Sequence, residues 1–175
     1  TIDREKLLYA LARVLTDQPR LPMELVAQQV GVSRATLHRM FPNREAILVA
    51  VLQMALEVGL RTIEQAELER GPADQALARF IEKALPHGAL HLFLASDRGE
   101  RCAASDDTDA RWDPHRRRIL ALFRRGQEEG VFRVDLPAQW MMDATGALMF
   151  TAADSIRAGR LAPADAVEAV LGMLL

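Results

Sequence analysis

Residues 23–45, MELVAQQVGVSRATLHRMFPNRE, carry the strongest structural signal in this 175-residue chain. This stretch predicts two short helices joined by a tight turn, with a third helix starting directly afterwards. Gly31 occupies the turn, because glycine most readily adopts the left-handed backbone that ends a helix. Ser33 is expected to cap the second helix by accepting a hydrogen bond from its first turn. The pattern predicts a helix-turn-helix, whose inward positions are small or apolar: Val26, Ala27, Val30, Val32, Leu37 and Met40.

The second of these short helices carries side chains suited to a DNA partner. In a helix-turn-helix this helix enters the major groove, so the side chains off its buried stripe are the ones that meet DNA. The arginines supply positive charge, and residues at helix starts lie where free backbone N–H groups favour a phosphate. The alternative is a solvated cationic surface without a partner. The predicted DNA-binding residues are Ser33, Arg34, Ala35, Thr36, His38, Arg39, Asn43 and Arg44.

Residues 7–56 resemble the N-terminal domain of the TetR/AcrR family of transcriptional regulators. The resemblance is carried by Gly31-Val32-Ser33, Arg34, Thr36-Leu37, His38, Phe41 and Arg44-Glu45. His38 stands where the family usually has Tyr, and Met40 where it often has His or Tyr, which affects individual DNA contacts rather than the fold. The resemblance implies that Arg44 contacts a phosphate at the start of the long helix.

The rest of the chain predicts an all-α protein. Ala, Leu and Arg dominate the composition, and no run of alternating β-branched residues predicts a strand. A helix over 43–69 would be roughly 40 Å long, which is enough to bridge two domains. We expect the acidic loop at Asp106, Asp107 and Asp109 to be disordered and residues 131–134 to form a loop that buries Phe132. Further helices are expected over 3–15, 73–85, 89–96, 114–129, 137–158 and 163–174.

Two domains are expected: a helix-turn-helix DNA-binding domain over 1–44 and a ligand-binding and dimerisation bundle over 45–175. In the family the last two long helices pair with those of a second subunit, and helix 137–158 suits this role through its small residues. A homodimer also follows from DNA reading, because two recognition helices can read half-sites about 34–36 Å apart.

The resemblance implies an effector cavity inside the C-terminal bundle. Large or adaptable side chains in this region are the candidates, with ordinary core packing as the alternative for each one. Because polar candidates are few, we expect an apolar or aromatic small molecule. The predicted ligand-binding residues are Phe80, His87, His91, Phe93, Trp112, Phe123, Trp140, Met141 and Met149.

Other chemistry finds little support in the sequence. His87 and His91 are four apart, but Pro86 and Gly88 interrupt their helix and no further ligand follows nearby, so no metal is predicted. No phosphate-cradling loop or nucleophile elbow is present, so no catalytic residue and no cofactor is expected. The basic residues Arg116–Arg118, Arg124 and Arg125 predict a solvated face, with a second nucleic-acid contact as the alternative.

The lone Cys102 excludes an intrachain disulfide, and no uncharged apolar stretch of membrane length is present, so a cytoplasmic protein without a membrane partner is expected. The leading hypothesis is a repressor that binds a palindromic double-stranded DNA operator as a homodimer and is released by an effector. An effector-independent regulator or an activator shares the same features. A helical enzyme or a protein-interaction bundle is the alternative from a different class.

Overall fold

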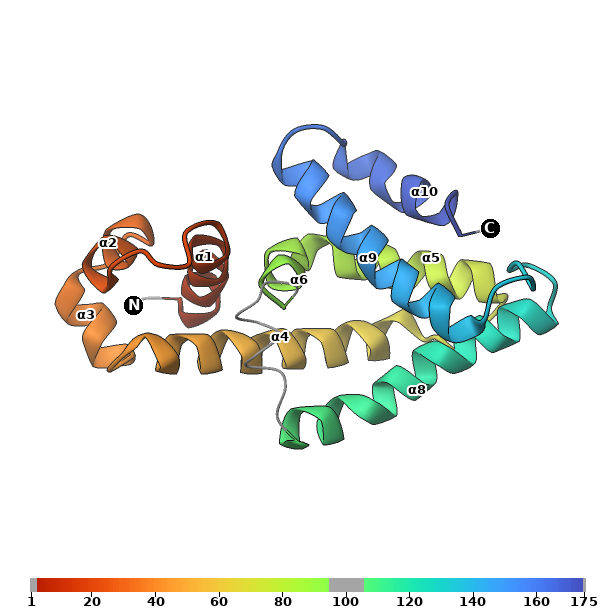
Figure 1. Cartoon of the computed structure of the whole chain (residues 1–175), viewed down its shortest axis with the longest axis horizontal. Helices are drawn as coiled ribbons and strands as arrows, with labels where there is room; N and C mark the ends of the chain where they lie inside the picture. The colour runs from red at the N-terminus through yellow and green to blue at the C-terminus, as the bar shows by residue number, and fades with distance from the viewer. Residues whose placement is uncertain (1–2, 95–105, 175) are drawn as a thin grey trace. The chain divides into compact units, whose positions relative to one another are not determined.

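The computed structural model describes residues 3–94 and 106–174, and within these ranges the chain is helical without any strand, which confirms the all-α prediction (Figure 1). The elements are α1 (Arg4–Asp17), α2 (Met23–Gln29), α3 (Arg34–Met40), α4 (Arg44–Ala66), α5 (Ala73–Ala84), η1 (Leu85–His87), α6 (Gly88–Leu94), α8 (Asp106–Glu128), α9 (Ala138–Arg157), η2 (Pro163–Asp165) and α10 (Ala166–Leu171).

The described residues form two compact units. Unit 1 holds the chain up to residue 57 together with residues 89–94, and unit 2 holds residues 58–88 and the chain from residue 106 onward. The helix α4 therefore runs from one unit into the other without a break. The predicted division of roles at residues 44 and 45 lies inside unit 1, because the first half of α4 belongs to the same compact unit as α1–α3. That division concerns function and stays a prediction.

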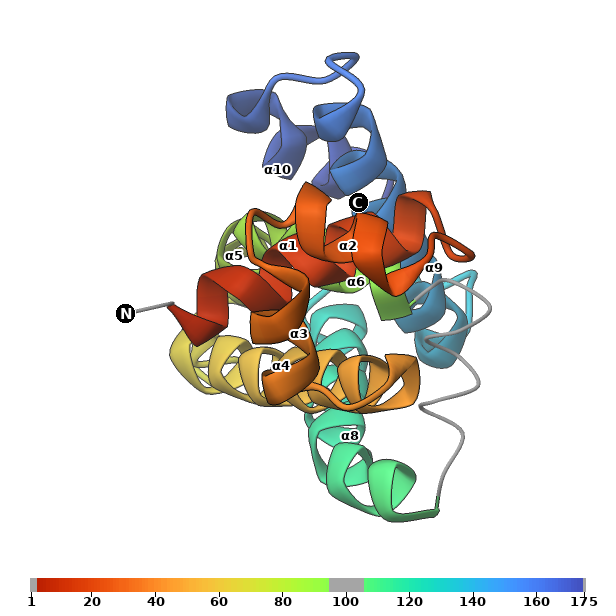
Figure 2. The same ribbon diagram turned by 90° about the vertical axis from the view of Figure 1, so that its left-hand side faces the viewer.

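Unit 1 is a small helical bundle around apolar side chains that solvent barely reaches. Figure 2, which faces this unit, shows α2 and α3 beside α1. Leu11, Leu37 and Ile47 are fully buried, one each from α1, α3 and α4. Gly31 has φ +75° in the turn between α2 and α3, as predicted. An alanine there would be strained, because L-residues rarely adopt a positive φ.

Unit 2 is built from α5, α8, α9 and α10, with α8 packed on α5 and α9, and α10 packed on α5 and α9. Its core includes Ile81, Phe123 and Met141, all at most 1% exposed. The loop after α8 buries Phe132, as predicted, with its ring centroid 5.5 Å from that of Phe123.

The start of α8 corrects the sequence prediction. A helix was expected from residue 114, after a disordered acidic loop, but α8 begins at Asp106 and continues through Pro114. Proline lacks the N–H that would bond the carbonyl four residues earlier, and its ring crowds that carbonyl; Ala110, at that place, is exposed to water. The Asp113 side chain pairs with Arg117 one turn later at 2.5 Å. The last two residues of the helix predicted over 89–96 lie outside the described residues.

Two further helices end differently from the prediction. The long helix stops at Ala66 rather than 69, because Glu67 has φ +47° and leaves the helical conformation. The C-terminal helix predicted over 163–174 is divided into η2 and α10.

Among the described residues one helix, α4, is long and apolar enough to cross a membrane by length and composition alone. Of its most apolar window, 61% is buried inside the protein, which is typical of a helix in a protein core.

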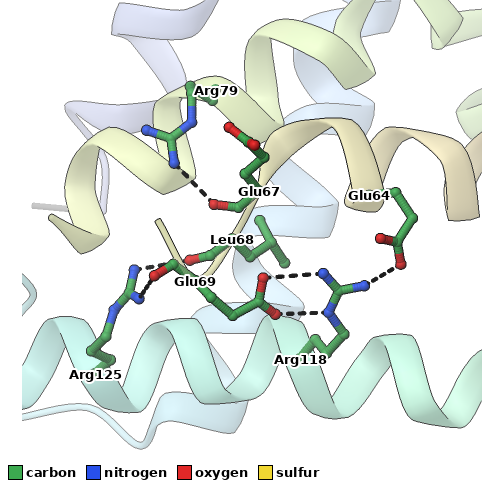
Figure 3. A network of polar contacts seen from close by, with 7 residues as sticks. All are labelled: Glu64, Glu67, Leu68, Glu69, Arg79, Arg118 and Arg125. Carbon is green, nitrogen blue, oxygen red and sulfur yellow. Dashed lines mark hydrogen bonds and ion pairs between the residues drawn. The ribbon is translucent and has the colours of Figure 1, made fainter. Parts of the chain in front are cut away.

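The prediction of a solvated basic face on α8 is wrong for two of its arginines, Arg118 and Arg125. Their side chains are only 29% and 28% exposed, and both reach the turn between α4 and α5 (Figure 3). Arg118 binds both carboxylate oxygens of Glu69, with Nε to Oε1 at 2.8 Å and Nη2 to Oε2 at 3.1 Å.

This pair predicts a small loss of stability in acid. The hydrogen bonds from Arg118 lower the pKa of Glu69 below its usual 4.5. The interaction therefore stabilises the folded chain above about pH 4.5 and is lost as the pH falls through the lower folded pKa. The Glu69 side chain is 64% exposed, so solvent screening limits the effect to about 1 kcal/mol or less. In urea unfolding, the difference between wild type and Glu69→Gln should be largest near neutral pH and shrink towards about pH 3. A difference that grows in acid would contradict the assignment.

Candidate nucleic-acid interface

One side of α3 anchors the helix in unit 1 and the other side is open to solvent. Leu37 is fully buried, and Phe41, directly after the helix, is 3% exposed. The exposed side is made by positions one turn apart, so these side chains share one continuous face. We call this surface the α3 face; it comprises Arg34, Ala35, His38 and Arg39, all exposed. Thr36, also predicted to bind DNA, is half-buried at its margin.

Ser33 and Asn43 both cap helices. The Ser33 hydroxyl accepts from the Thr36 backbone N–H at 3.1 Å and donates to the Thr36 hydroxyl at 2.9 Å. The Asn43 side-chain oxygen accepts from the Ala46 backbone N–H at 2.9 Å at the start of α4. These bonds fix where α3 and α4 begin, which sets the direction of the α3 face. The DNA contacts of both side chains stay predictions.

Arg34 has a partner that the sequence did not indicate. Its Nη1 lies 2.7 Å from Oε1 of Glu24 on α2, with both side chains more than half exposed. An exposed pair of this kind contributes at most about 1 kcal/mol. A DNA phosphate or base edge can therefore replace Glu24 at low cost. No local spacing signals this pair, because it depends on how α2 and α3 cross.

Arg44 is used inside unit 1. Its Nη1 donates to the carbonyl of Pro19 at 2.9 Å, and its Nη2 donates to the carbonyl of Leu21. The guanidinium thereby ties the turn between α1 and α2 to the first residue of α4. The sequence predicts that Arg44 contacts a phosphate. In such a contact the guanidinium would bind the phosphate and these two carbonyls together.

Replacing Arg44 by alanine is expected to lower the free energy of unfolding by about 1.5–3 kcal/mol, the usual contribution of hydrogen bonds from a charged group. The matched control is Arg20→Ala, which removes an exposed arginine from the same turn and should change stability by less than about 0.5 kcal/mol. Urea unfolding followed by circular dichroism measures both. Equal losses in the two variants would contradict the structural role of Arg44.

The predicted ligand-binding residues are distributed over both units. Phe123, Met141 and Met149 are buried in the core of unit 2, with Phe80 and Trp112 packed against it. His87 belongs to unit 2, whereas His91 and Phe93 belong to unit 1.

Trp140, also predicted to bind the ligand, is 56% exposed in the single chain. The physical reason is the helical period of α9. Its buried stripe runs through Met141, Thr145, Met149 and Ala152, and Trp140 lies beside that stripe.

A pocket of about 350 Å³ lies on the first half of α8, lined by Ala110, Trp112, Asp113 and Arg116. Of the predicted ligand residues it contains Trp112; sequence reasoning missed the other three. The Trp112 ring is held against Gly59 of α4, where a Cβ atom would lie 2.8 Å from the ring. The pocket thus offers an aromatic ring for stacking, with Arg116 beside it and the Asp113 carboxylate paired with Arg117.

Comparison with known proteins connects this geometry to a function. The family model described as "Bacterial regulatory proteins, tetR family" matches residues 19–51, which include α2, α3 and the start of α4. The HTH-type transcriptional regulator NfxB of Pseudomonas aeruginosa is 34% identical over 172 residues, 98% of this chain and 91% of the relative. The HTH-type transcriptional repressor LfrR of Mycolicibacterium smegmatis is 30% identical over 146 residues, 83% of this chain and 75% of the relative.

A solved structure is similar over almost the whole chain. The TetR-like regulator LfrR from Mycobacterium smegmatis in complex with proflavine has a TM-score of 0.74 and 27% identity, over 96% of this chain and 91% of that one.

Proposed function

The chain belongs to the TetR family of bacterial transcriptional regulators, and on that premise we propose that it is a repressor that binds a palindromic operator as a homodimer. Family membership makes it a DNA-binding regulator rather than an enzyme. We place its action in the cytoplasm, where bacterial DNA lies. An effector bound in unit 2 would release it from the operator.

The observation that carries the proposal is the α3 face. Arg34 and Arg39 are exposed on a helix that Leu37 anchors from the opposite side and that Ser33 caps at its start. A helix held in this way can enter a major groove without rearrangement, and its arginines can bind bases or phosphates. His38 and Ala35 lie on the same face. We therefore assign DNA reading to α3 and a separate regulatory role to unit 2.

A homodimer through α9 and α10 is supported by the apolar surface of α9. Trp140 is 56% and Phe150 38% exposed, and Gly146 and Ala147 between them are also exposed. Large exposed aromatic residues combined with small ones favour close packing against another helix. We propose that Trp140 contributes to the subunit interface instead of the ligand site.

For the effector we propose a planar aromatic molecule, with a cationic dye such as proflavine as the probe. The support is the pocket beside Trp112 and Asp113, together with a similar regulator that was crystallised with proflavine. The aromatic ring offers stacking to a planar molecule, while the Asp113 carboxylate beside it is already paired with Arg117. Met141 and Met149 of the adjacent core can repack around such a ligand.

The experiment is a mobility shift on operator DNA recovered from genomic fragments, with increasing proflavine. We expect release of the operator, seen as an at least tenfold weaker binding, which corresponds to about 1.4 kcal/mol of coupling. Trp112→Ala should reduce this response, whereas Arg133→Gln, which breaks an exposed ion pair with Asp135, should leave it unchanged. Operator binding that proflavine and other planar aromatic compounds leave unchanged would favour an effector-independent regulator. Increased transcription from the bound promoter would favour an activator.

A further inference from the structure

The carbonyl groups at the C-terminal end of α4 are held by an arginine of the next helix. Nη2 of Arg79 donates to the carbonyl of Glu67 at 3.0 Å (Figure 3). The same Nη2 donates to the carbonyl of Arg70 at 2.6 Å, and Nε of Arg79 donates to that of Ala66 at 3.0 Å. A single guanidinium thus joins the last residue of α4 to the turn that follows it.

Two arginines of α8 hold the same turn from another side. Arg125 donates through Nη1 to the carbonyl of Glu69 and through Nη2 to that of Leu68, both at 2.9 Å. Arg118 binds the Glu69 carboxylate with two hydrogen bonds and the Glu64 carboxylate with a third. Every carbonyl from residue 66 to residue 70 therefore accepts a hydrogen bond from Arg79 or Arg125. We call Arg79, Arg118 and Arg125 the arginine clamp.

The clamp occupies a place where helices usually end with glycine. The last four carbonyls of a helix have no partner within it, and a glycine in the left-handed conformation often closes them. Here the left-handed position is Glu67, with φ +47°, which costs energy for a residue with a side chain. The guanidinium contacts offset that cost, so the geometry of the turn depends on side chains from α5 and α8.

The first residue of α5 is tied to α8 as well. The backbone N–H of Ala73 donates to Oε2 of Glu129 at 2.8 Å, and Oε1 of Glu129 lies 3.3 Å from Nε of Arg125. Both sides of the turn are thereby fixed to α8 or to Glu129, the residue directly after it. At the opposite end of α4, Arg44 makes the same kind of guanidinium-to-carbonyl contact within unit 1.

We infer that the arginine clamp consists of positioning residues that fix the direction of α4 in unit 2, so that a displacement of α5 or α8 is transmitted through α4 to α3. This regulatory role rests on the proposed function, but the rigidity that it requires is measurable without DNA or effector. The planar fork of arginine is essential to the clamp, because lysine offers a point charge that cannot hold several carbonyls in a fixed geometry.

The test measures how firmly α4 is held. Spin labels are attached to cysteines introduced as Gln28→Cys on α2 and Gln75→Cys on α5, both exposed positions and one in each unit. Cys102→Ser removes the native thiol, so that only these two positions are labelled. Labelled chains are diluted with unlabelled ones, so that only distances within one chain are recorded. The variant is Arg79→Gln with Arg125→Gln, and the matched control is Arg133→Gln, which breaks an exposed ion pair with Asp135 elsewhere in unit 2.

We expect the clamp variant to broaden the distance distribution at least twofold, while the control keeps the wild-type width. The single variant Arg79→Lys, which keeps the charge, should give an intermediate width and serves if the double variant does not fold. A wild-type width in a folded clamp variant, with unchanged helix content by circular dichroism, would overturn the inference.

A second readout tests the regulatory role in the full chain on operator DNA. The ratio of operator affinities without and with proflavine should fall from at least tenfold in wild type to below threefold in Arg79→Lys. The Arg133→Gln control should keep the wild-type ratio. A wild-type chain that binds no operator contradicts the proposed function and leaves the distance measurement to decide the clamp. If Arg79→Lys broadens the distance distribution but keeps the wild-type ratio of operator affinities, the inference that displacements are transmitted through the clamp is overturned.

Discussion

Replacing Arg34 and Arg39 together by alanine is expected to weaken operator binding at least a hundredfold while the chain stays folded. Both side chains are exposed on the α3 face, so their loss opens no cavity. A well-placed arginine contact to a base contributes about 1–3 kcal/mol of discrimination, and two such contacts account for a hundredfold or more. Arg34 additionally loses its ion pair with Glu24, which is exposed and contributes at most about 1 kcal/mol.

The matched control removes the same charge elsewhere. Arg124→Ala with Arg133→Ala takes two exposed arginines from unit 2, and operator binding should stay within about threefold of wild type. Mobility shifts at several salt concentrations distinguish contacts to DNA phosphates from contacts to bases. A loss of phosphate contacts lowers the salt dependence by about one unit for each arginine, whereas a loss of base contacts reduces sequence preference. Equal weakening in both double variants would argue for a general charge effect and against α3 as the reading helix.

Replacing Gly126 by alanine is expected to destabilise unit 2 by about 2–3 kcal/mol. The added Cβ would lie 2.1 Å from the Cδ2 atom of Phe132, whose ring is buried and packed against Phe123. Overpacking of a filled core typically costs about 1–3 kcal/mol. A loss of stability is informative whatever its size, because alanine in place of glycine inside a helix ordinarily stabilises the helix by about 1 kcal/mol.

A double-mutant cycle with Phe132→Ala identifies the cause. Phe132→Ala alone should cost about 3–5 kcal/mol, since it leaves a cavity in the core. With the ring gone, Gly126→Ala should cost nothing or stabilise the helix, so the two effects should be strongly non-additive in urea unfolding. Additive losses would show that Gly126 acts through its backbone rather than through the approach of Phe132.

Much of unit 1 was predictable because its signals are local. Gly31 and Ser33 determine the turn and the start of α3 through their own backbone and side chain, and both lie where the sequence placed them. The buried position of Leu37 follows from the helical period. The contacts of Arg34 with Glu24 and of Arg44 with Pro19 and Leu21 were missed, because they depend on how separate helices cross.

Contacts between residues far apart in the sequence also explain where the prediction for unit 2 differs from the structure. Arg118 and Arg125 read as a solvated face, yet their partners lie 49 to 57 residues earlier in the chain. Pro114 suggested a helix start, whereas α8 simply continues through it. The ligand role of the large residues at 123, 141 and 149 stays a prediction, because composition alone does not distinguish a pocket wall from a packed core. The exposure of Trp140 was not predictable in the same way, because a single position along α9 separates it from the buried Met141.

The central claim is that two copies of this chain read one DNA duplex through α3. The most direct measurement is selection of bound fragments from genomic DNA, performed in parallel with the wild-type chain and with the Arg34→Ala, Arg39→Ala variant. We predict that wild type enriches an inverted repeat whose half-sites are centred about 34–36 Å apart, or a multiple of that distance, and that the variant enriches none. An enriched site without two-fold symmetry, or the same site recovered by the variant, would contradict the claim.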